Sequence, residues 1–254
     1  MAGTTESTAE RFARYQDSLA SRLRYEQTQR NLAELHDLGR PRRVLDAAGG
    51  NGLNTEFLLS QGHAVTLLDA DPEMLRQARE RLGGAGLLAR CEFQEGTLEG
   101  MAGILPHGRF DLILCHHAIE YSKSPRQIFA GFRDLASAGG EVSLITLNPV
   151  SEVIRAAVFR RDAALAREKL GDLRYDARWF GQAMLYPFEQ IRAWAEEASL
   201  KLADFRALRV LADYIPEEQA AGQADAVLAL EHDLAAREPY RRFGRYLQFC
   251  LKRS

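Results

Sequence analysis

Two aspartates and a run of glycines have the spacing of a binding site for a small cofactor. Residues 44–52 read Val-Leu-Asp-Ala-Ala-Gly-Gly-Asn-Gly, so Asp46 closes a short apolar run and Gly49 and Gly50 follow it. Asp69 closes the next apolar run along the chain. A strand that enters a helix through a glycine turn lets the backbone approach a ligand closely, with helix N–H groups facing it. These residues therefore predict a site built from acids and backbone groups.

The glycine spacing argues against a dinucleotide. It departs from the G-x-G-x-x-G spacing with which dinucleotide sites seat a pyrophosphate. S-adenosylmethionine (SAM) has no phosphate, and Asp46 with the looser turn suits its ammonium and methionine tail. Asp69 can accept hydrogen bonds from both ribose hydroxyls, as an acid does in dinucleotide folds. The alternative for both acids is that they cap helices or turns.

The elements that must position these residues alternate between strands and helices. Short apolar runs predict strands, and the segments between them have helical patterns. This alternation predicts parallel βαβ units with right-handed crossovers, and a last strand that returns antiparallel at a sheet edge. The strands are expected at 43–46, 64–68, 90–94, 110–115, 140–147, 201–211 and 245–251, and the helices of the first half at 55–61, 72–82 and 125–135.

No repeat or linker divides the chain, so residues 1–254 are expected to form a single domain. Residues 1–40 would be a helical cap, because 7–38 reads as helical with Phe12 and Tyr15 on its apolar side. Residues 41–147 would be the cofactor core, and 148–254 would supply substrate-side helices and the last strands. In that last part the pattern predicts helices over 151–169, 187–198 and 217–236, and an irregular stretch around Trp179.

Composition limits the partners and the location. The net charge of −2 gives no overall positive field that would draw the protein onto nucleic acid, although arginine supplies nearly all of the basic residues. Three well-separated cysteines suggest neither a disulfide framework nor a metal site. The polar N-terminus and the lack of a long apolar run favour a cytoplasmic protein without a membrane span.

Three segments together resemble the motifs of class I SAM-dependent methyltransferases in order and spacing. They are 43–52, 67–69 and 110–116, and the resemblance is strong over roughly residues 40 to 147. It implies an α/β fold with a Rossmann-like, seven-stranded, mostly parallel sheet, its last strand antiparallel, plus helical cap elements. It also implies SAM as the cofactor.

Within this class the chain is most similar to the bacterial tRNA 5-carboxymethoxyuridine methyltransferase family. The further likeness rests on Leu23-Arg24, on Arg209-Val210 with Asp213-Tyr214, and on Arg237-Glu238-Pro239-Tyr240 with Gly244-Arg245-Tyr246. The resemblance implies that Arg24 meets the methionine carboxylate, that Leu98 lies near adenine and that His116 faces the methyl-transfer cleft. A core or capping histidine is the alternative for His116. With Asp46, the implied SAM site is Arg24, Asp46, Gly49, Gly50, Asp69, Thr97, Leu98 and His116, of which His116 is also the catalytic candidate.

The same resemblance implies carboxylate O-methylation of 5-carboxymethoxyuridine at the tRNA wobble position. A carboxylate is ionised at neutral pH and needs no general base, but it needs orientation by arginine or tyrosine. For any single arginine, an ion pair with a neighbouring acid is the competing role. The candidates for substrate binding are Arg209, Tyr214, Arg237, Tyr240, Arg245 and Tyr246.

Two other functions remain open. The tRNA family has a lysine-rich segment after the fifth strand, whereas residues 163–182 here nearly cancel their own charge and would bind phosphates weakly. A small metabolite methylated at oxygen or nitrogen is therefore the alternative acceptor, with His116 as a base. A SAM-binding sensor without catalysis is the third hypothesis.

Overall fold

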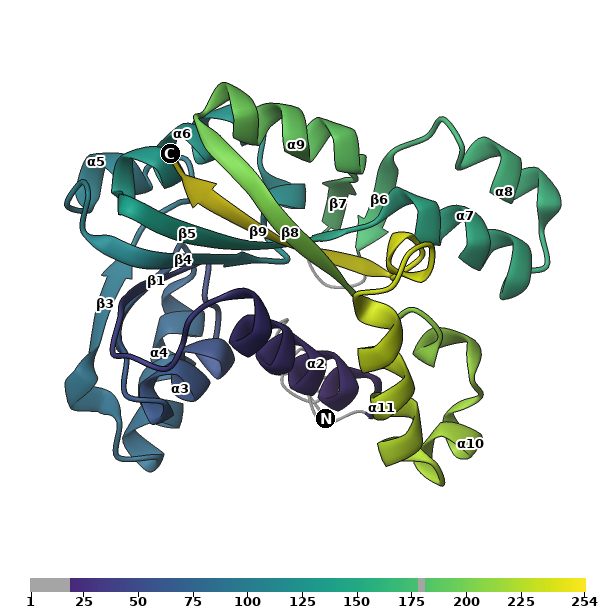
Figure 1. Ribbon diagram of the computed structural model, residues 1–254, viewed down its shortest axis with the longest axis horizontal. Coiled ribbons are helices and arrows are strands. Elements are labelled where there is room, and N and C mark those ends of the chain that lie inside the picture. The colour runs from purple at the N-terminus through teal and green to yellow at the C-terminus, as the bar shows by residue number, and fades with distance from the viewer. Residues whose placement is uncertain (1–18, 178–180) are drawn as a thin grey trace, which may run out of the picture.

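The computed structural model describes residues 19–177 and 181–254, and their centre is a seven-stranded sheet of order β3-β2-β1-β4-β5-β9-β8 (Figure 1). β9 pairs antiparallel with β5 and β8, and the other neighbours pair parallel. The mostly parallel sheet with its last strand reversed is confirmed. β9 does not lie at the sheet edge as expected, because β8 covers its outer side. The strands are β1 (Arg43–Ala47), β2 (Ala64–Asp69), β3 (Cys91–Glu95), β4 (Phe110–His116), β5 (Ala136–Leu147), β8 (Leu200–Leu208) and β9 (Tyr246–Arg253).

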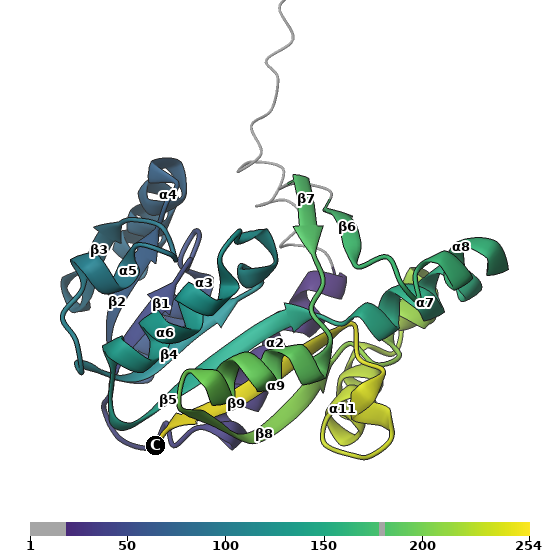
Figure 2. The ribbon, with the colours of Figure 1, turned by 90° about the horizontal axis from the view of Figure 1, so that it is seen from above.

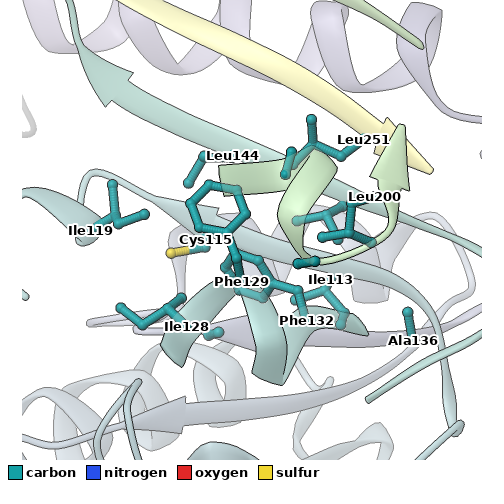
Figure 3. Close-up of a cluster of buried hydrophobic side chains, with 14 of the residues drawn as sticks. Ile113, Cys115, Ile119, Ile128, Phe129, Phe132, Ala136, Leu144, Leu200 and Leu251 are labelled. Atoms are coloured by element: carbon teal, nitrogen blue, oxygen red, sulfur yellow. The ribbon is translucent and has the colours of Figure 1, made fainter. Parts of the chain in front are cut away.

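Helices cover both faces of this sheet because successive strand residues point to opposite sides. Leu45 and Ile113 belong to a core shared with α5, α6 and α9, part of which is shown in Figure 3. Val44 and Leu112 belong to the core shared with α2, α3 and α4. In the described ranges no helix has the length and apolar character to cross a membrane. The covering helices are α2 (Leu19–Leu35), α3 (Leu53–Ser60), α4 (Pro72–Gly84), α5 (Met101–Ile104), α6 (Pro125–Leu135) and α9 (Phe188–Glu197).

The chain between β5 and α9 differs from the expected pattern. The single helix expected over 151–169 is two helices, α7 (Pro149–Val158) and α8 (Ala163–Glu168). Arg161 has a φ of 51°, and the Asp162 carboxylate accepts a hydrogen bond from the Leu165 N–H (2.9 Å), so a new helix is capped there. The stretch expected to be irregular is an antiparallel hairpin of β6 (Arg174–Ala177) and β7 (Gly181–Met184), with Trp179 outside the described residues.

The segment expected as one helix over 217–236 is likewise divided, into α10 (Glu217–Ala221) and α11 (Ala224–Ala235), with Gly222 between them. In both overall views α7, α8 and α11 lie together beyond one end of the sheet (Figure 2). Short 3-10 turns complete the described chain: η1 (Leu88–Arg90), η2 (Ile119–Tyr121), η3 (Ala212–Tyr214) and η4 (Tyr240–Arg242).

Helix α2 is held against the last strands by side-chain amides. The Gln27 amide nitrogen donates to the backbone carbonyl of Glu231 (3.0 Å), and that of Asn31 donates to the carbonyl of Ala207 (3.3 Å). Of the N-terminal helix expected over 7–38, the described part ends at Leu35, and Phe12 and Tyr15 lie outside the described residues. α2 therefore joins the N-terminal segment to β8 and α11.

Candidate active site

A cavity of about 1030 Å³ lies at the carboxyl ends of β1, β2, β4 and β5, where open parallel sheets bind their ligands. It has two halves. The half beside β1 and β2 contains every residue expected to bind a cofactor: Arg24, Asp46, Gly49, Gly50, Asp69, Thr97, Leu98 and His116. The other half is lined by Arg155, Tyr175, Arg209, Arg245 and Tyr246. We call these the glycine half and the arginine half.

The turn after β1 needs its glycines. Gly50 has a φ of 56° and Gly52 one of 78°, both in the left-handed region that side chains disfavour. A Cβ at Gly49 would come within 2.8 Å of the Asp46 carboxylate, which lies directly behind it. The backbone of this turn therefore lies closer to Asp46 than any residue with a side chain would permit.

The two acids of the glycine half have different environments. Asp46 is fully buried, accepts a hydrogen bond from the Thr55 hydroxyl (2.7 Å), and burial raises its pKa to about 6. Asp69 accepts hydrogen bonds from the backbone N–H groups of Gly50 (2.8 Å) and Asp71 (2.9 Å), and burial raises its pKa as well. Each carboxylate oxygen can accept two hydrogen bonds, so Asp69 retains acceptor capacity toward the cavity while it also organises the turn.

Arg24 reaches the cavity from α2 and is 6% exposed. Its guanidinium carbon lies 4.7 Å from the ring centroid of Tyr25 and 6.0 Å from that of Tyr246. On the opposite wall the Thr97 hydroxyl accepts a hydrogen bond from the Gly100 N–H (3.2 Å), and Leu98 packs against the main core. A cation and an apolar wall thus flank the glycine turn.

His116 ends β4 with both ring nitrogens engaged. The Asn54 amide nitrogen lies 3.3 Å from Nδ1, and the Ser143 hydroxyl lies 2.9 Å from Nε2. Because an amide N–H₂ only donates, Nδ1 is the acceptor and Nε2 carries the proton. Burial, with the charges of His36 and Arg24, lowers the pKa of His116 to about 3. This neutral, fixed imidazole is suited to shaping the cleft, and it is a poor general base.

The arginine half contains a network that we call the arginine cluster: Arg155, Arg209 and Arg245 with Asp213 and Glu152. Arg209, Arg245 and Asp213 are the most buried of these side chains, and that of Arg155 is 30% exposed. Asp213 pairs with Arg155 and Arg209 and lies 3.7 Å from Arg245. Glu152 lies 3.2 Å from Arg245 and 3.6 Å from Arg155. Three guanidiniums face two carboxylates, so one positive charge is left over. A buried surplus charge is costly unless an anion compensates it.

Two tyrosines complete this half. Arg245 donates hydrogen bonds to the hydroxyls of Tyr175 (3.1 Å) and Tyr246 (3.3 Å). Burial by itself would raise the pKa of Tyr246, but Arg245, Arg24 and Arg209 together lower it to about 8. The ring of His117 meets that of Tyr246 edge-on at 4.6 Å, beside the end of β4.

The loop after β8 holds Arg209 in place. Arg209 has a φ of 56°, and its N–H donates to the Gln27 side-chain oxygen (3.0 Å). The buried carboxylate of Glu231 accepts three backbone N–H groups, from Val210 (2.6 Å), Leu211 (2.7 Å) and Ala212 (2.5 Å). Charge-assisted bonds of this kind are stronger than neutral ones, so Glu231 fixes the backbone that carries Arg209.

The six residues expected to bind substrate do not all meet. Arg209, Arg245 and Tyr246 line the cavity, whereas Tyr214 is not part of its wall and stacks on Phe159. Arg237 and Tyr240 are exposed and lie off the cavity wall. Between them, the Glu238–Pro239 bond is cis, and the adjoining turn places Arg241 over the Phe205 ring.

Sequence reasoning missed Arg155, Tyr175 and Glu152 as residues of this half. Arg155 and Glu152 belong to the arginine-bearing helix expected over 151–169, where nothing local distinguishes them from a solvated face. Tyr175 comes from the hairpin that was expected to be irregular. No motif could have identified these three residues, because only the fold brings them to Arg245.

Comparisons with known proteins also indicate a methyltransferase. Residues 44–140 match a family described as a methyltransferase domain. The tRNA 5-carboxymethoxyuridine methyltransferase of Escherichia coli (strain K12) is 28% identical over 218 residues, covering 83% of this chain and 80% of that protein. A ubiquinone biosynthesis O-methyltransferase of Azotobacter vinelandii is 27% identical over 163 residues, covering 64% of this chain and 66% of that protein.

Solved structures share the fold. An S-adenosylmethionine dependent methyltransferase from Mesorhizobium loti superposes with a TM-score of 0.64 at 17% identity, covering 88% of this chain and 96% of that one. The 1,6-didemethyltoxoflavin-N1-methyltransferase of Burkholderia thailandensis, bound to its acceptor and S-adenosylhomocysteine, gives 0.56 at 17% identity, covering all of this chain and 93% of that one.

Proposed function

We propose that this chain, whose residues 44–140 match a methyltransferase domain, is a SAM-dependent methyltransferase that transfers the methyl group to a carboxylate held by the arginine cluster. The proposed acceptor is the carboxymethoxy group of 5-carboxymethoxyuridine in tRNA. The observation that carries the proposal is the surplus positive charge of the arginine cluster, whose Arg245 is buried beside two tyrosine hydroxyls on the cavity wall.

The glycine half fits the cofactor. The glycine turn on the cavity wall, the remaining acceptor capacity of Asp69 and the cation of Arg24 suit a ligand with a ribose and a carboxylate. Asp46 is the second acid on this wall. The cavity is at the upper end of the usual range for ligand sites, about 300–1,000 Å³, which leaves room for an acceptor beside the cofactor.

SAM supplies a methyl group activated by a sulfonium, so the protein mainly has to align the reactants. Good alignment recovers on the order of 7–11 kcal/mol of the barrier. In the proposed mechanism Arg245 binds the acceptor carboxylate, Tyr175 and Tyr246 hold the guanidinium in place, and His116 forms the cleft wall. No base is required, because a carboxylate is ionised at neutral pH. This agrees with a His116 whose two nitrogens are already bonded.

Charge also favours binding of the acceptor and release of the product. The carboxylate brings the negative charge that the arginine cluster lacks, whereas the methyl ester is neutral. Substrate is thus bound more strongly than product, and the ester is released from a site that again has an uncompensated charge.

The tRNA acceptor is supported by the E. coli relative, whose name states that substrate and which aligns over 80% of its length. The test is to incubate the protein with labelled SAM and with tRNA that bears the carboxymethoxy group, 5-methoxyuridine or unmodified uridine at the wobble position. We expect label, removable by mild alkali as an ester, only with the first. Equal label on all three, or none, would refute the proposal.

A small metabolite is the second candidate, and the hairpin region favours it. Asp172 pairs with both Lys169 (3.0 Å) and Arg174 (2.8 Å), so this segment has little charge left for phosphates. Under this alternative a phenol or amine would need a base. His116 could serve only if its Nδ1 were released by Asn54, and in that case His116→Ala would abolish turnover while SAM binding remained. Transfer to a fraction of cell extract free of RNA, with none to tRNA, would favour the metabolite.

A further inference from the structure

An aromatic pair, of which one ring is exposed and the other half-buried, lies beside the arginine half of the cavity. Phe159, at the end of α7, and Tyr214, in η3, stack with ring centroids 5.3 Å apart and planes 9° from parallel. Phe159 remains 45% exposed, so part of its ring is available to a ligand. We call this pair the aromatic platform.

The platform is connected to the cavity through Arg155. This guanidinium lines the cavity, pairs with Asp213 in the arginine cluster, and lies 5.1 Å from the Phe159 ring centroid. A ligand that extends out of the arginine half past Arg155 would therefore reach Phe159 next.

Two arginines follow Phe159 directly and carry free charge. Arg160 and Arg161 are exposed, and within residues 19–177 and 181–254 neither forms an ion pair. The neighbouring acid, Asp162, caps α8 through the Leu165 N–H instead. This differs from Arg174 on the hairpin, which Asp172 neutralises.

We propose that the aromatic platform stacks the base of the nucleotide next to the methylated uridine, and that Arg160 and Arg161 bind the adjoining phosphates. The inference rests on the proposed tRNA acceptor and adds to it a site for the flanking chain. An exposed ring beside unpaired cations is the combination that binds single-stranded nucleic acid, because every base has a face that stacks and every linkage has a charge. A protein partner would be expected to bury a wider apolar area than one ring.

The first test compares two substrates: 5-carboxymethoxyuridine as the free nucleoside, and an anticodon stem-loop that contains it. In Phe159→Ala we expect kcat/KM for the stem-loop to fall on the order of 10-fold, and to fall much less for the nucleoside. Phe159→Trp should retain the activity on the stem-loop. On a stem-loop whose flanking nucleotide lacks its base, Phe159→Ala and the unmodified protein should have the same kcat/KM. Leu170→Ala removes another exposed apolar side chain, away from the cavity wall, and is the control. An equal loss on both substrates, or no loss on either, would overturn the stacking role.

The second test measures binding of a fluorescent stem-loop against salt concentration. Replacing Arg160 and Arg161 by Gln should reduce the slope of log Kd against log salt by about 1.4, at roughly 0.7 per single-stranded phosphate contact. Lys201→Gln is the control, since Lys201 is exposed at the opposite end of β8. An unchanged slope would refute the phosphate contacts. If neither substrate is methylated, the proposed function fails. The fluorescence anisotropy of the labelled stem-loop, compared between Phe159→Ala and the unmodified protein, then decides whether the platform binds RNA.

Discussion

Replacing Arg245 by Met tests whether the surplus charge of the arginine cluster binds the acceptor. The change leaves Arg155 and Arg209 opposite Asp213 and Glu152, so the cluster becomes neutral without leaving an acid unpaired. We therefore expect a folded protein whose SAM affinity, measured by calorimetry, is close to that of the original, because Arg245 lies in the arginine half.

The expected loss is in acceptor binding. Truncating one partner of a buried, hydrogen-bonded charge pair costs about 2–5 kcal/mol. Two arginines remain nearby, so the lower part of this range applies, equivalent to an increase on the order of 30- to 100-fold in KM for the acceptor. Arg241→Met is the matched control, since Arg241 pairs with Asp204 and Glu238 away from the cavity wall.

A second substitution distinguishes charge from packing. Adding Asp213→Asn to Arg245→Met restores a surplus of one positive charge, because Arg155 and Arg209 then face Glu152 alone. Part of the lost acceptor affinity should return in the double variant. If KM does not rise in Arg245→Met, or if the double variant binds the acceptor no better than the single one, the charge argument is wrong.

Three other substitutions test the arginine half, the glycine half and the loop after β8. The pKa of Tyr246 is lowered from about 10 to about 8, so in the folded protein its phenolate forms above pH 8 and cancels the surplus charge. The KM for the acceptor should therefore rise above pH 8, and this rise should disappear in Tyr246→Phe. Because the pKa is depressed on folding, ionised Tyr246 stabilises the fold only at alkaline pH, and urea titrations should show that contribution vanish as pH falls through 8. Asp69→Asn should raise the Kd for SAM on the order of 10- to 100-fold by calorimetry, and an unchanged Kd would remove Asp69 from the cofactor site. Glu231→Gln should lower the free energy of unfolding by about 1.5–3 kcal/mol and raise the KM for the acceptor more than the Kd for SAM. An equal effect on both ligands would mean that the substitution loosens the whole fold rather than the loop that carries Arg209.

The sheet and the glycine half could be predicted from sequence because both are local. Most strands of the sheet contain a short apolar run, although β3 and β8 are more polar, and Asp46, the glycines and Asp69 follow two such runs directly. The hairpin was missed because Arg-Tyr-Asp-Ala has no apolar run long enough to indicate a strand. The two divided helices were missed because their breaks, at Asp162 and Gly222, interrupt patterns that remain helical on both sides.

The arginine half could not be predicted as a unit. Its members come from α7, β6, the loop after β8, η3 and the residues at the start of β9, and no single motif joins α7 and β6 to the other three. Arg209 and Arg245 entered the prediction only through resemblance, while Arg155 and Glu152 acquire their meaning from Asp213 and Arg245, far away in the chain. Whether an arginine neutralises an acid or binds a ligand depends on the charge balance of the whole cluster, which requires the folded structure.

Helix α2 carries Arg24 on the cofactor side and, one turn later, Gln27, whose amide bonds the backbone of Arg209 and the carbonyl of Glu231. A small rotation of this helix would displace both contacts at once. Exchanging residues 19–35 for those of a relative therefore replaces a cavity residue of the glycine half together with the support of Arg209 in the arginine half. A chimaera that keeps Arg24 without Gln27 should retain SAM affinity and lose acceptor affinity. Attempts to alter acceptor choice by engineering would do better to leave this helix intact and vary α7.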